Sequence, residues 1–126
     1  MNARGLRDKS CQLVLDFLKR YPKDLGILIA AATDNSALGA VQAVRELKRE
    51  KYVAIVRQDC IPEALQEISR SDSPLIGSVS HEAQSYGPRL IHLGLSLLSG
   101  HRVAPYNYVE HKMVTGPWAA QGGKTA

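Results

Sequence analysis

Five polar residues follow three apolar runs of the chain, and their types and positions suit hydrogen bonding to a small polar ligand. Thr33 and Asp34 come after Ile27–Ala32, Arg57 and Asp59 come after Tyr52–Val56, and His81 comes after Leu75–Val79. A carboxylate is a favourable acceptor here, because a charged acceptor makes a stronger hydrogen bond to a hydroxyl group than a neutral one does. Open α/β sheets bind ligands at the carboxyl ends of their strands, where these residues lie if the runs are parallel strands.

Each candidate also has a purely structural interpretation. Asp34 suits a helix cap, an interpretation that we favour over ligand contact, since short polar side chains accept hydrogen bonds from the first turn of a helix. Asp59 precedes Pro62 and suits a loop or a capping position, and a lone histidine such as His81 suits a polar loop. Tyr86 lies on an apolar stripe and is expected in the core rather than against a ligand.

The remaining reactive residues form no catalytic or metal-binding pattern. His92, His101 and His111 lack the spacing of metal ligands. Cys11 and Cys60 are too far apart for a redox pair and too few for a disulfide framework. We find no nucleophile with a partnered base, no phosphate-binding glycine loop and no paired carboxylates. The sequence therefore predicts a protein that is not an enzyme, with no metal and no cofactor.

The first candidate pair lies in a predicted strand, turn and helix. The unbroken apolar run Ile27–Ala32 is typical of a strand buried on both faces, as in a parallel sheet. Four small polar residues follow, of which Asp34, Asn35 or Ser36 is the expected helix cap. Apolar residues then recur at helical spacing, at Ala37, Ala40, Val41, Val44 and Leu47.

The same patterns continue on both sides of this unit. Helices are expected at Leu6–Arg20, Pro62–Arg70 and Ala83–Ser99, strands at Tyr52–Val56, Leu75–Val79 and Lys112–Val114, and extended chain at Val103–Val109. The last helix has an apolar stripe of Tyr86, Leu90, Leu93, Leu97 and Leu98. Alternation of strands and helices implies right-handed crossovers and a mostly parallel sheet. The predicted fold class is α/β, a three-layer α/β/α sandwich. Residues 116–126 are expected to form a disordered tail, apart from Trp118.

Composition places the chain among globular proteins and gives little support to nucleic-acid binding. The 126 residues carry a net charge of +4, but in the stretch from Arg45 to Lys51 cations alternate with carboxylates, which is typical of a solvated helix end. No apolar run reaches the length of about 18 residues that a membrane span requires. The N-terminus has no hydrophobic segment and is not a signal peptide, so the chain as given would stay in the cytoplasm if it is complete.

Several motifs, taken in order, resemble one family of binding proteins. Residues 32–40 (ATDNSALGA) resemble the (Asn)-Asp-x-x-Ala-Leu-Gly-Ala motif of type I periplasmic sugar-binding proteins and LacI-type effector domains. Residues 54–59 are similar to the family's next strand, Val-x-Ile-Val-Gly-x-Asp. The stretches 76–81, 86–87, 97–100 and 108–115 follow the family's later strand, helix, Leu-Leu-x-Gly turn and closing strand. The resemblance covers Leu13 to about Thr115.

The resemblance implies that residues 1–115 are part of the C-terminal lobe of a two-lobe protein. By this resemblance, the sequence contains no counterpart of the N-terminal lobe or of the first two strands of the C-terminal lobe. In the family's sheet order, one of those strands neighbours Ile27–Ala32, so this strand is expected to have an open edge. Because open apolar edges associate, we expect a homo-oligomer that uses this edge or the adjacent uncovered helix faces.

The resemblance also assigns roles to the candidate residues. Asp59 matches the family's sugar-binding aspartate, Thr33 stands where many members have a ligand-binding asparagine, and His81 stands where a polar ligand contact is common. Arg57 and Cys60 depart from the pattern, since the family usually has glycine at both positions. Arg57 is expected either to crowd the site or to supply a cation for an acidic ligand.

The function implied is binding of a small-molecule sugar by the substrate-binding component of an ABC-type transporter, or by a fragment of one. Its partners would be a sugar and the transporter permease, and its location would be the periplasm. The alternatives are the effector domain of a LacI-type transcriptional regulator and a truncated product without a ligand. A preceding signal peptide would indicate transport, and a preceding helix-turn-helix would indicate regulation.

Overall fold

The computed structural model describes residues 1–117, and it contains four α-helices and four strands in alternating order. They are α1 (Arg7–Arg20), β1 (Ile27–Ala30), α2 (Asp34–Glu46), β2 (Val53–Gln58), α3 (Pro62–Ile68), β3 (Leu75–Ser80), α4 (Tyr86–Leu98) and β4 (Lys112–Thr115). Every predicted helix and strand has a counterpart, with ends that shift by a few residues. Trp118 and most of the predicted tail lie outside the described residues.

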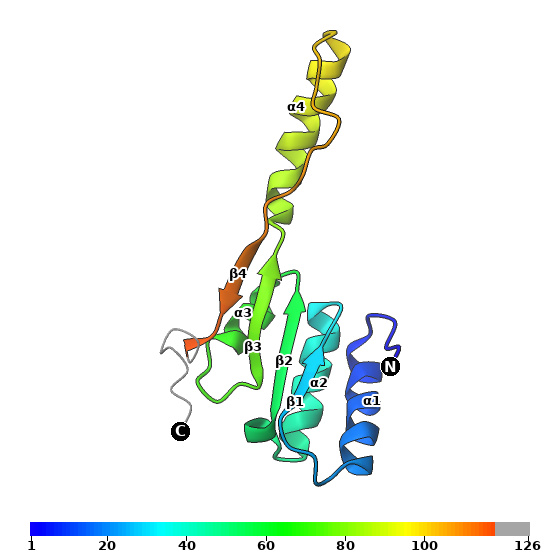
Figure 1. Cartoon of the computed structure of the whole chain (residues 1–126), viewed down its shortest axis with the longest axis vertical. Helices are drawn as coiled ribbons and strands as arrows, with labels where there is room; N and C mark the ends of the chain where they lie inside the picture. The colour runs from blue at the N-terminus through cyan, green and yellow to red at the C-terminus, as the bar shows by residue number, and fades with distance from the viewer. Residues whose placement is uncertain (118–126) are drawn as a thin grey trace.

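The four strands form one sheet in the order β1-β2-β3-β4 (Figure 1). The first three strands are parallel, and β4 is antiparallel to β3. This arrangement confirms the predicted α/β fold with a mostly parallel sheet. In the described chain β1 has a neighbour on one side only, so its other edge is open.

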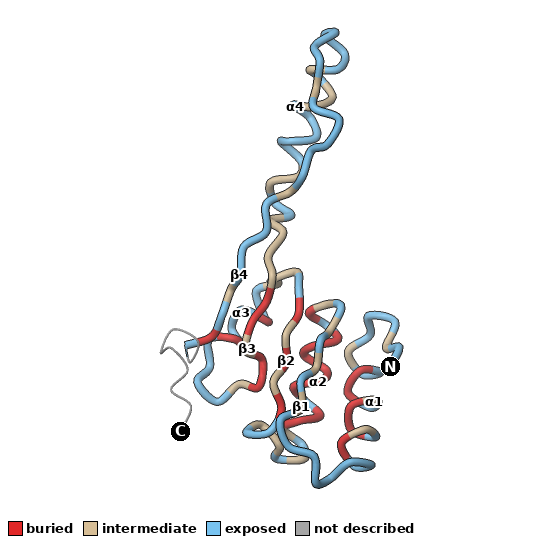
Figure 2. Tube along the Cα trace, viewed as in Figure 1, coloured by how far each residue is buried: buried red, intermediate tan, exposed pale blue. Residues whose placement is uncertain are grey.

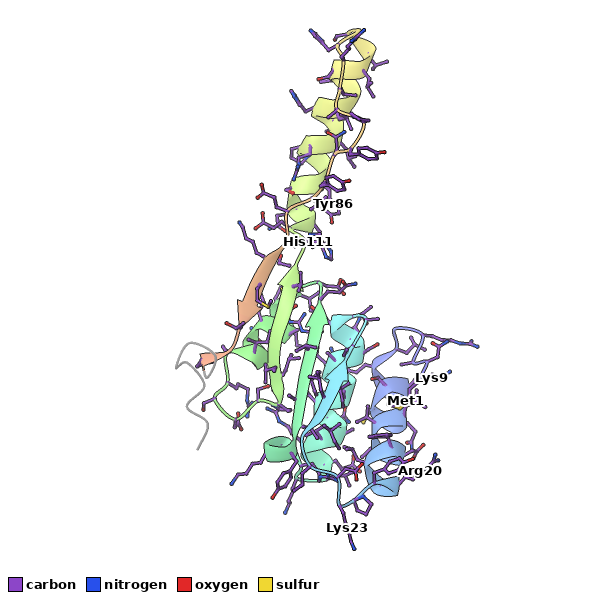
Figure 3. All side chains as sticks on the ribbon, viewed as in Figure 1. Met1, Lys9, Arg20, Lys23, Tyr86 and His111 are labelled. Carbon is purple, nitrogen blue, oxygen red and sulfur yellow. The ribbon has the colours of Figure 1, made fainter. Side chains whose placement is uncertain are left out.

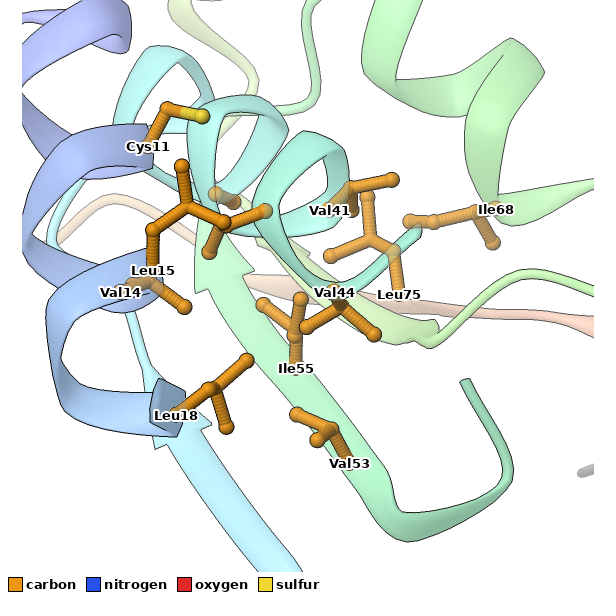
Figure 4. Packing of buried hydrophobic residues seen from close by; sticks show 13 residues of the cluster. Cys11, Val14, Leu15, Leu18, Val41, Val44, Val53, Ile55, Ile68 and Leu75 are labelled. Carbon is orange, nitrogen blue, oxygen red and sulfur yellow. The ribbon is translucent and has the colours of Figure 1, made fainter. Parts of the chain in front are cut away.

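A continuous hydrophobic core joins one face of the sheet to α1, α2 and α3 (Figure 4). The sheet contributes Val53, Ile55 and Leu75, and α2 contributes the small and β-branched side chains that the helical spacing predicted. Fully burying a side chain the size of valine or leucine stabilises a fold by about 1.5–3 kcal/mol. These contacts fix α2 against β2, and they thereby fix the turn that precedes α2.

The other face of the sheet is not covered by helices α1 to α3. Leu28 of β1 is 65% exposed, and Ala30 on the same face is also exposed. The expectation that this strand is buried on both faces is therefore wrong for the described chain. Figure 2 shows the buried residues concentrated in α1, α2, β2 and β3.

Helix α4 extends away from the sheet as an arm (Figure 1). Its predicted apolar stripe forms, but α4 has no buried residue, and Leu98 is 86% exposed. The expectation that this stripe packs inward is wrong, because α4 leaves the end of β3 and does not fold back over the sheet. The chain returns beside α4, where Arg89 Nη2 donates a hydrogen bond to the Tyr108 carbonyl oxygen at 2.9 Å, and then enters β4.

Candidate functional site

Asp59 and His81 lie close together beyond the ends of two neighbouring parallel strands. His81 Nε2 is 3.9 Å from Asp59 Oδ1, and the side chains of His81 and Asp59 are 27% and 32% exposed. The backbone N–H of Asp34, the first residue of α2, donates to Asp59 Oδ2 at 3.4 Å. The structure thus brings together residues that the sequence placed at three separate strand ends.

The backbone at Asp59 and Cys60 adopts conformations that favour glycine. The φ angles are +112° at Asp59 and +66° at Cys60. Glycine adopts such angles without a steric penalty, which gives a physical reason for the glycine that the resembling family has at the position of Cys60. In this chain the turn is held by the Asp59 N–H, which donates to the Val79 carbonyl oxygen at 3.1 Å, and by a Cys60 Sγ–Ser78 Oγ contact of 3.1 Å.

Asp34 and Arg57 form a buried ion pair beneath this turn. Their side chains are 2% and 0% exposed, and the Asp34 carboxylate also accepts a hydrogen bond from the Ile61 N–H. Burial lowers the pKa of the Arg57 guanidinium, an effect that the nearby Cys60 and Asp59 oppose. Arg57 therefore lies beneath the turn and not at the exposed surface, and its expected effect on a ligand, by crowding or by charge, stays a prediction.

Thr33, rather than any of the three residues after it, is the N-cap of α2. Its Oγ1 accepts a hydrogen bond from the Ser36 N–H at 3.3 Å and lies 3.2 Å from Ser36 Oγ. The predicted cap at Asp34, Asn35 or Ser36 is thus wrong, because extended backbone at Thr33 aims its hydroxyl at the first turn. Ligand contact by Thr33 stays a prediction, as it does for Asp34 and Arg57.

The base of the α4 arm borders the candidate site. The rings of His81 and Tyr86 stack with centroids 6.0 Å apart and planes inclined by 29°, and Figure 3 shows Tyr86 where the arm leaves the sheet. Lys112 Nζ lies 2.6 Å from Glu82 Oε1 and ties the two chain segments of the arm together. Sequence reasoning missed this pair, because Glu82 and Lys112 are thirty positions apart and do not lie in the same helix or strand.

The side chains at the candidate site can make hydrogen bonds to a polar ligand. Asp59 offers carboxylate oxygens, His81 offers a ring nitrogen, and the stacked Tyr86 supports that ring. Among residues 1–117, no group of three or more histidine, cysteine, aspartate or glutamate side chains is placed to hold a metal ion. No helix in the same range is long and apolar enough to cross a membrane.

Comparison by sequence gives no match to a protein-family model or to a curated protein. Comparison of structures, in contrast, gives matches to solved proteins. A solute-binding protein of an ABC transporter from Agrobacterium vitis, solved with bound allitol, superimposes on 91% of this chain with a TM-score of 0.82 and 26% identity. A periplasmic solute-binding protein from Actinobacillus succinogenes with bound D-allose superimposes on 96% of it, with a TM-score of 0.81 and 20% identity. The chain has the fold of type I periplasmic sugar-binding proteins.

The type I periplasmic-binding-protein fold accounts for the resemblance of the sequence motifs. An ABC sugar transporter subunit from Rhodobacter sphaeroides shares the fold over 87% of this chain, with a TM-score of 0.81 and 23% identity. The chain spans about 40% of the length of these proteins, with matches to 40%, 42% and 39% of their chains. The three neighbours are described as solute-binding proteins or as a sugar transporter subunit, and none of the three is described as an enzyme.

Proposed function

We propose that this chain is part of the solute-binding component of an ABC-type sugar transporter, and that it carries one side of a sugar site. Residues 1–115 correspond, in this proposal, to part of the C-terminal lobe. The observation that carries the proposal is the cluster of Asp59 and His81, 3.9 Å apart and partly exposed at the strand ends. It is supported by neighbours of the same fold that were solved with allitol and D-allose.

The proposed contacts follow from the geometry of this cluster. One Asp59 oxygen is held by the Asp34 N–H, which leaves the carboxylate oriented with acceptor capacity for ligand hydroxyl groups. His81 adds a second polar contact, and its stacking on Tyr86 limits its orientation. A site formed by one lobe leaves much of a sugar in water, so binding by this chain is expected to be weak.

The proposed partners and location follow from the same function. A solute-binding component delivers its sugar to a transporter permease, and closure of two lobes around the ligand is the signal for delivery. The neighbour from Actinobacillus succinogenes is periplasmic. We therefore place the full-length protein in the periplasm with a permease as its partner.

Asp59→Asn is expected to weaken binding of D-allose by about 10- to 100-fold, because a hydrogen bond to a charged group contributes about 1.5–3 kcal/mol. Saturation-transfer NMR with D-allose as the probe measures this change. Asp72→Asn is the matched control, since it changes an exposed aspartate in the same way. The Asp72 carboxylate accepts hydrogen bonds from Arg70 Nε and Nη2 at 3.1 and 3.2 Å. Equal saturation transfer to the wild type and to Asp59→Asn would contradict the role of Asp59.

A second copy of the chain is the proposed occupant of the open β1 edge. The edge strand carries the exposed Leu28, and two copies of one strand can pair through a symmetric contact that uses the same groups on each. Leu28→Lys is expected to reduce the apparent mass toward that of a monomer in light scattering, since edge lysines oppose strand pairing. Leu25→Lys is the control, because Leu25 is similarly exposed but precedes the strand. A wild-type monomer at high concentration would rule out this assembly.

A further inference from the structure

Asp34 contacts the 59–61 turn in two ways. Its backbone N–H donates to the Asp59 carboxylate at 3.4 Å, and its own carboxylate accepts from the Ile61 N–H. Asp34 therefore restrains both the side chain of Asp59, the proposed sugar-binding residue, and the backbone two residues later, at Ile61. These contacts bridge 25 and 27 positions of sequence, so they couple the start of α2 to the start of α3.

The turn between these contacts requires restraint. Asp59 and Cys60 both have left-handed φ angles, which carry a steric cost for residues other than glycine that the surrounding structure must offset. The Asp59 N–H is bonded to Val79 of β3, whereas the N–H of Ile61, at the other end of the turn, depends on the Asp34 carboxylate. Loss of that acceptor would free the turn to relax.

Arg57 supplies the counter-charge for the buried Asp34 carboxylate. A buried carboxylate is costly unless a counter-charge and hydrogen bonds compensate it. Arg57 reaches Asp34 from the covered face of β2, because Val53, Ile55 and Arg57 alternate onto the same buried side of the strand. The arginine thus acts from the buried side of the turn.

We infer that Arg57 and Asp34 act as a pair of positioning residues that hold the 59–61 turn so that Asp59 is presented to a sugar. This inference rests on the proposed function for its meaning, but the positioning itself is a property of the free protein. It assigns to Arg57, which stands where the resembling family usually has glycine, the role of holding a turn in which the family has glycine at the position of Cys60. In this inference the pair acts through the turn and not through contact with the sugar.

Arg57→Met tests the inference without any ligand, because methionine keeps much of the apolar volume and removes the charge. Amide hydrogen exchange, followed by NMR, is expected to quicken at least about tenfold at Asp59 and Ile61 and to change little at Ile55 and Val44 in the core. Arg57→Lys keeps a cation and is expected to restore part of the protection. The matched control is Arg45→Met, which breaks a two-bond pair with Glu67 (2.8 and 3.0 Å) between α2 and α3.

The outcomes separate positioning from simple stability. Uniform loss of protection across the core, or unchanged exchange at Ile61, would overturn the inference. If Arg57→Met does not fold, the double variant Arg57→Met with Asp34→Asn removes both buried charges, and selective exchange at Asp59 and Ile61 is still expected. Saturation transfer from the protein to D-allose is also expected to decrease in Arg57→Met, because the relaxed turn no longer presents Asp59 to the sugar. Absence of any D-allose signal in the wild type would overturn the proposed function while leaving the exchange result to decide the positioning.

Discussion

Asp34→Ala will lower the free energy of unfolding by about 3–5 kcal/mol, the usual cost of removing one partner from a buried ion pair. The change leaves the fully buried Arg57 guanidinium without its counter-charge and the Ile61 N–H without its acceptor. Urea denaturation followed by far-ultraviolet circular dichroism measures the loss.

Asp16→Ala provides the comparison for Asp34→Ala. Asp16 is exposed on α1, and its carboxylate accepts a hydrogen bond from Gln12 at 2.8 Å, one turn away. Exposed pairs of this kind contribute little, so the expected change is below about 0.5 kcal/mol. A loss below about 1 kcal/mol in Asp34→Ala would show that the interior tolerates Arg57 without its partner, contrary to the expectation for a buried charge.

Gly39→Ala will also destabilise the fold, by about 1–3 kcal/mol or more, because α1 and α2 cross at this glycine. A Cβ atom at position 39 would lie 2.2 Å from the Arg7 carbonyl oxygen and 3.0 Å from the Cys11 nitrogen, both of which are backbone atoms that cannot rotate away. The helices would have to separate, which would also stretch the buried 2.7 Å hydrogen bond from Ser10 Oγ to the Ser36 carbonyl oxygen.

Gly94→Ala is the matched control for the same measurement. Gly94 also lies within a helix, but a Cβ atom added at position 94 would meet no atom within 4 Å beyond its own stretch of α4. Alanine is favoured over glycine in a helix by about 0.5–1 kcal/mol, so this variant is expected to be unchanged or slightly more stable. Equal stability of Gly39→Ala and the wild type would contradict the close approach of α1 and α2.

The order of the elements and the location of the candidate site could be predicted from local patterns. Apolar runs that end in polar turns identified β1, β2 and β3, and parallel pairing then required their carboxyl ends to meet at one edge. The approach of Asp59 to His81 follows from that geometry. Alternation along β2 also contained a signal for the burial of Arg57, since Val53 and Ile55 face the core and the next position in that series is Arg57.

Other features depend on contacts between distant parts of the chain. The Arg7 guanidinium donates to both Glu63 carboxylate oxygens at 2.8 and 2.7 Å, across 56 positions of sequence, and no local pattern encodes such a pair. The apolar stripe of α4 predicted a buried helix, but amphipathicity states only that a face prefers an apolar partner. It does not state which segment supplies that partner, and none of residues 1–117 buries this face.

Amide chemical shifts of the isotope-labelled wild-type chain, recorded while D-allose is added to millimolar excess, test the proposed sugar site most directly. Changes confined to residues 33–34, 59–61 and 80–82, with a weak and saturable dependence on D-allose, are the predicted result. Inositol hexaphosphate in parallel distinguishes an acidic ligand from a neutral sugar, and the buried Arg57 predicts no response to it at residues 57–61. Absence of saturable shifts, or shifts that map to the α4 arm instead of the strand ends, would contradict a sugar site at Asp59.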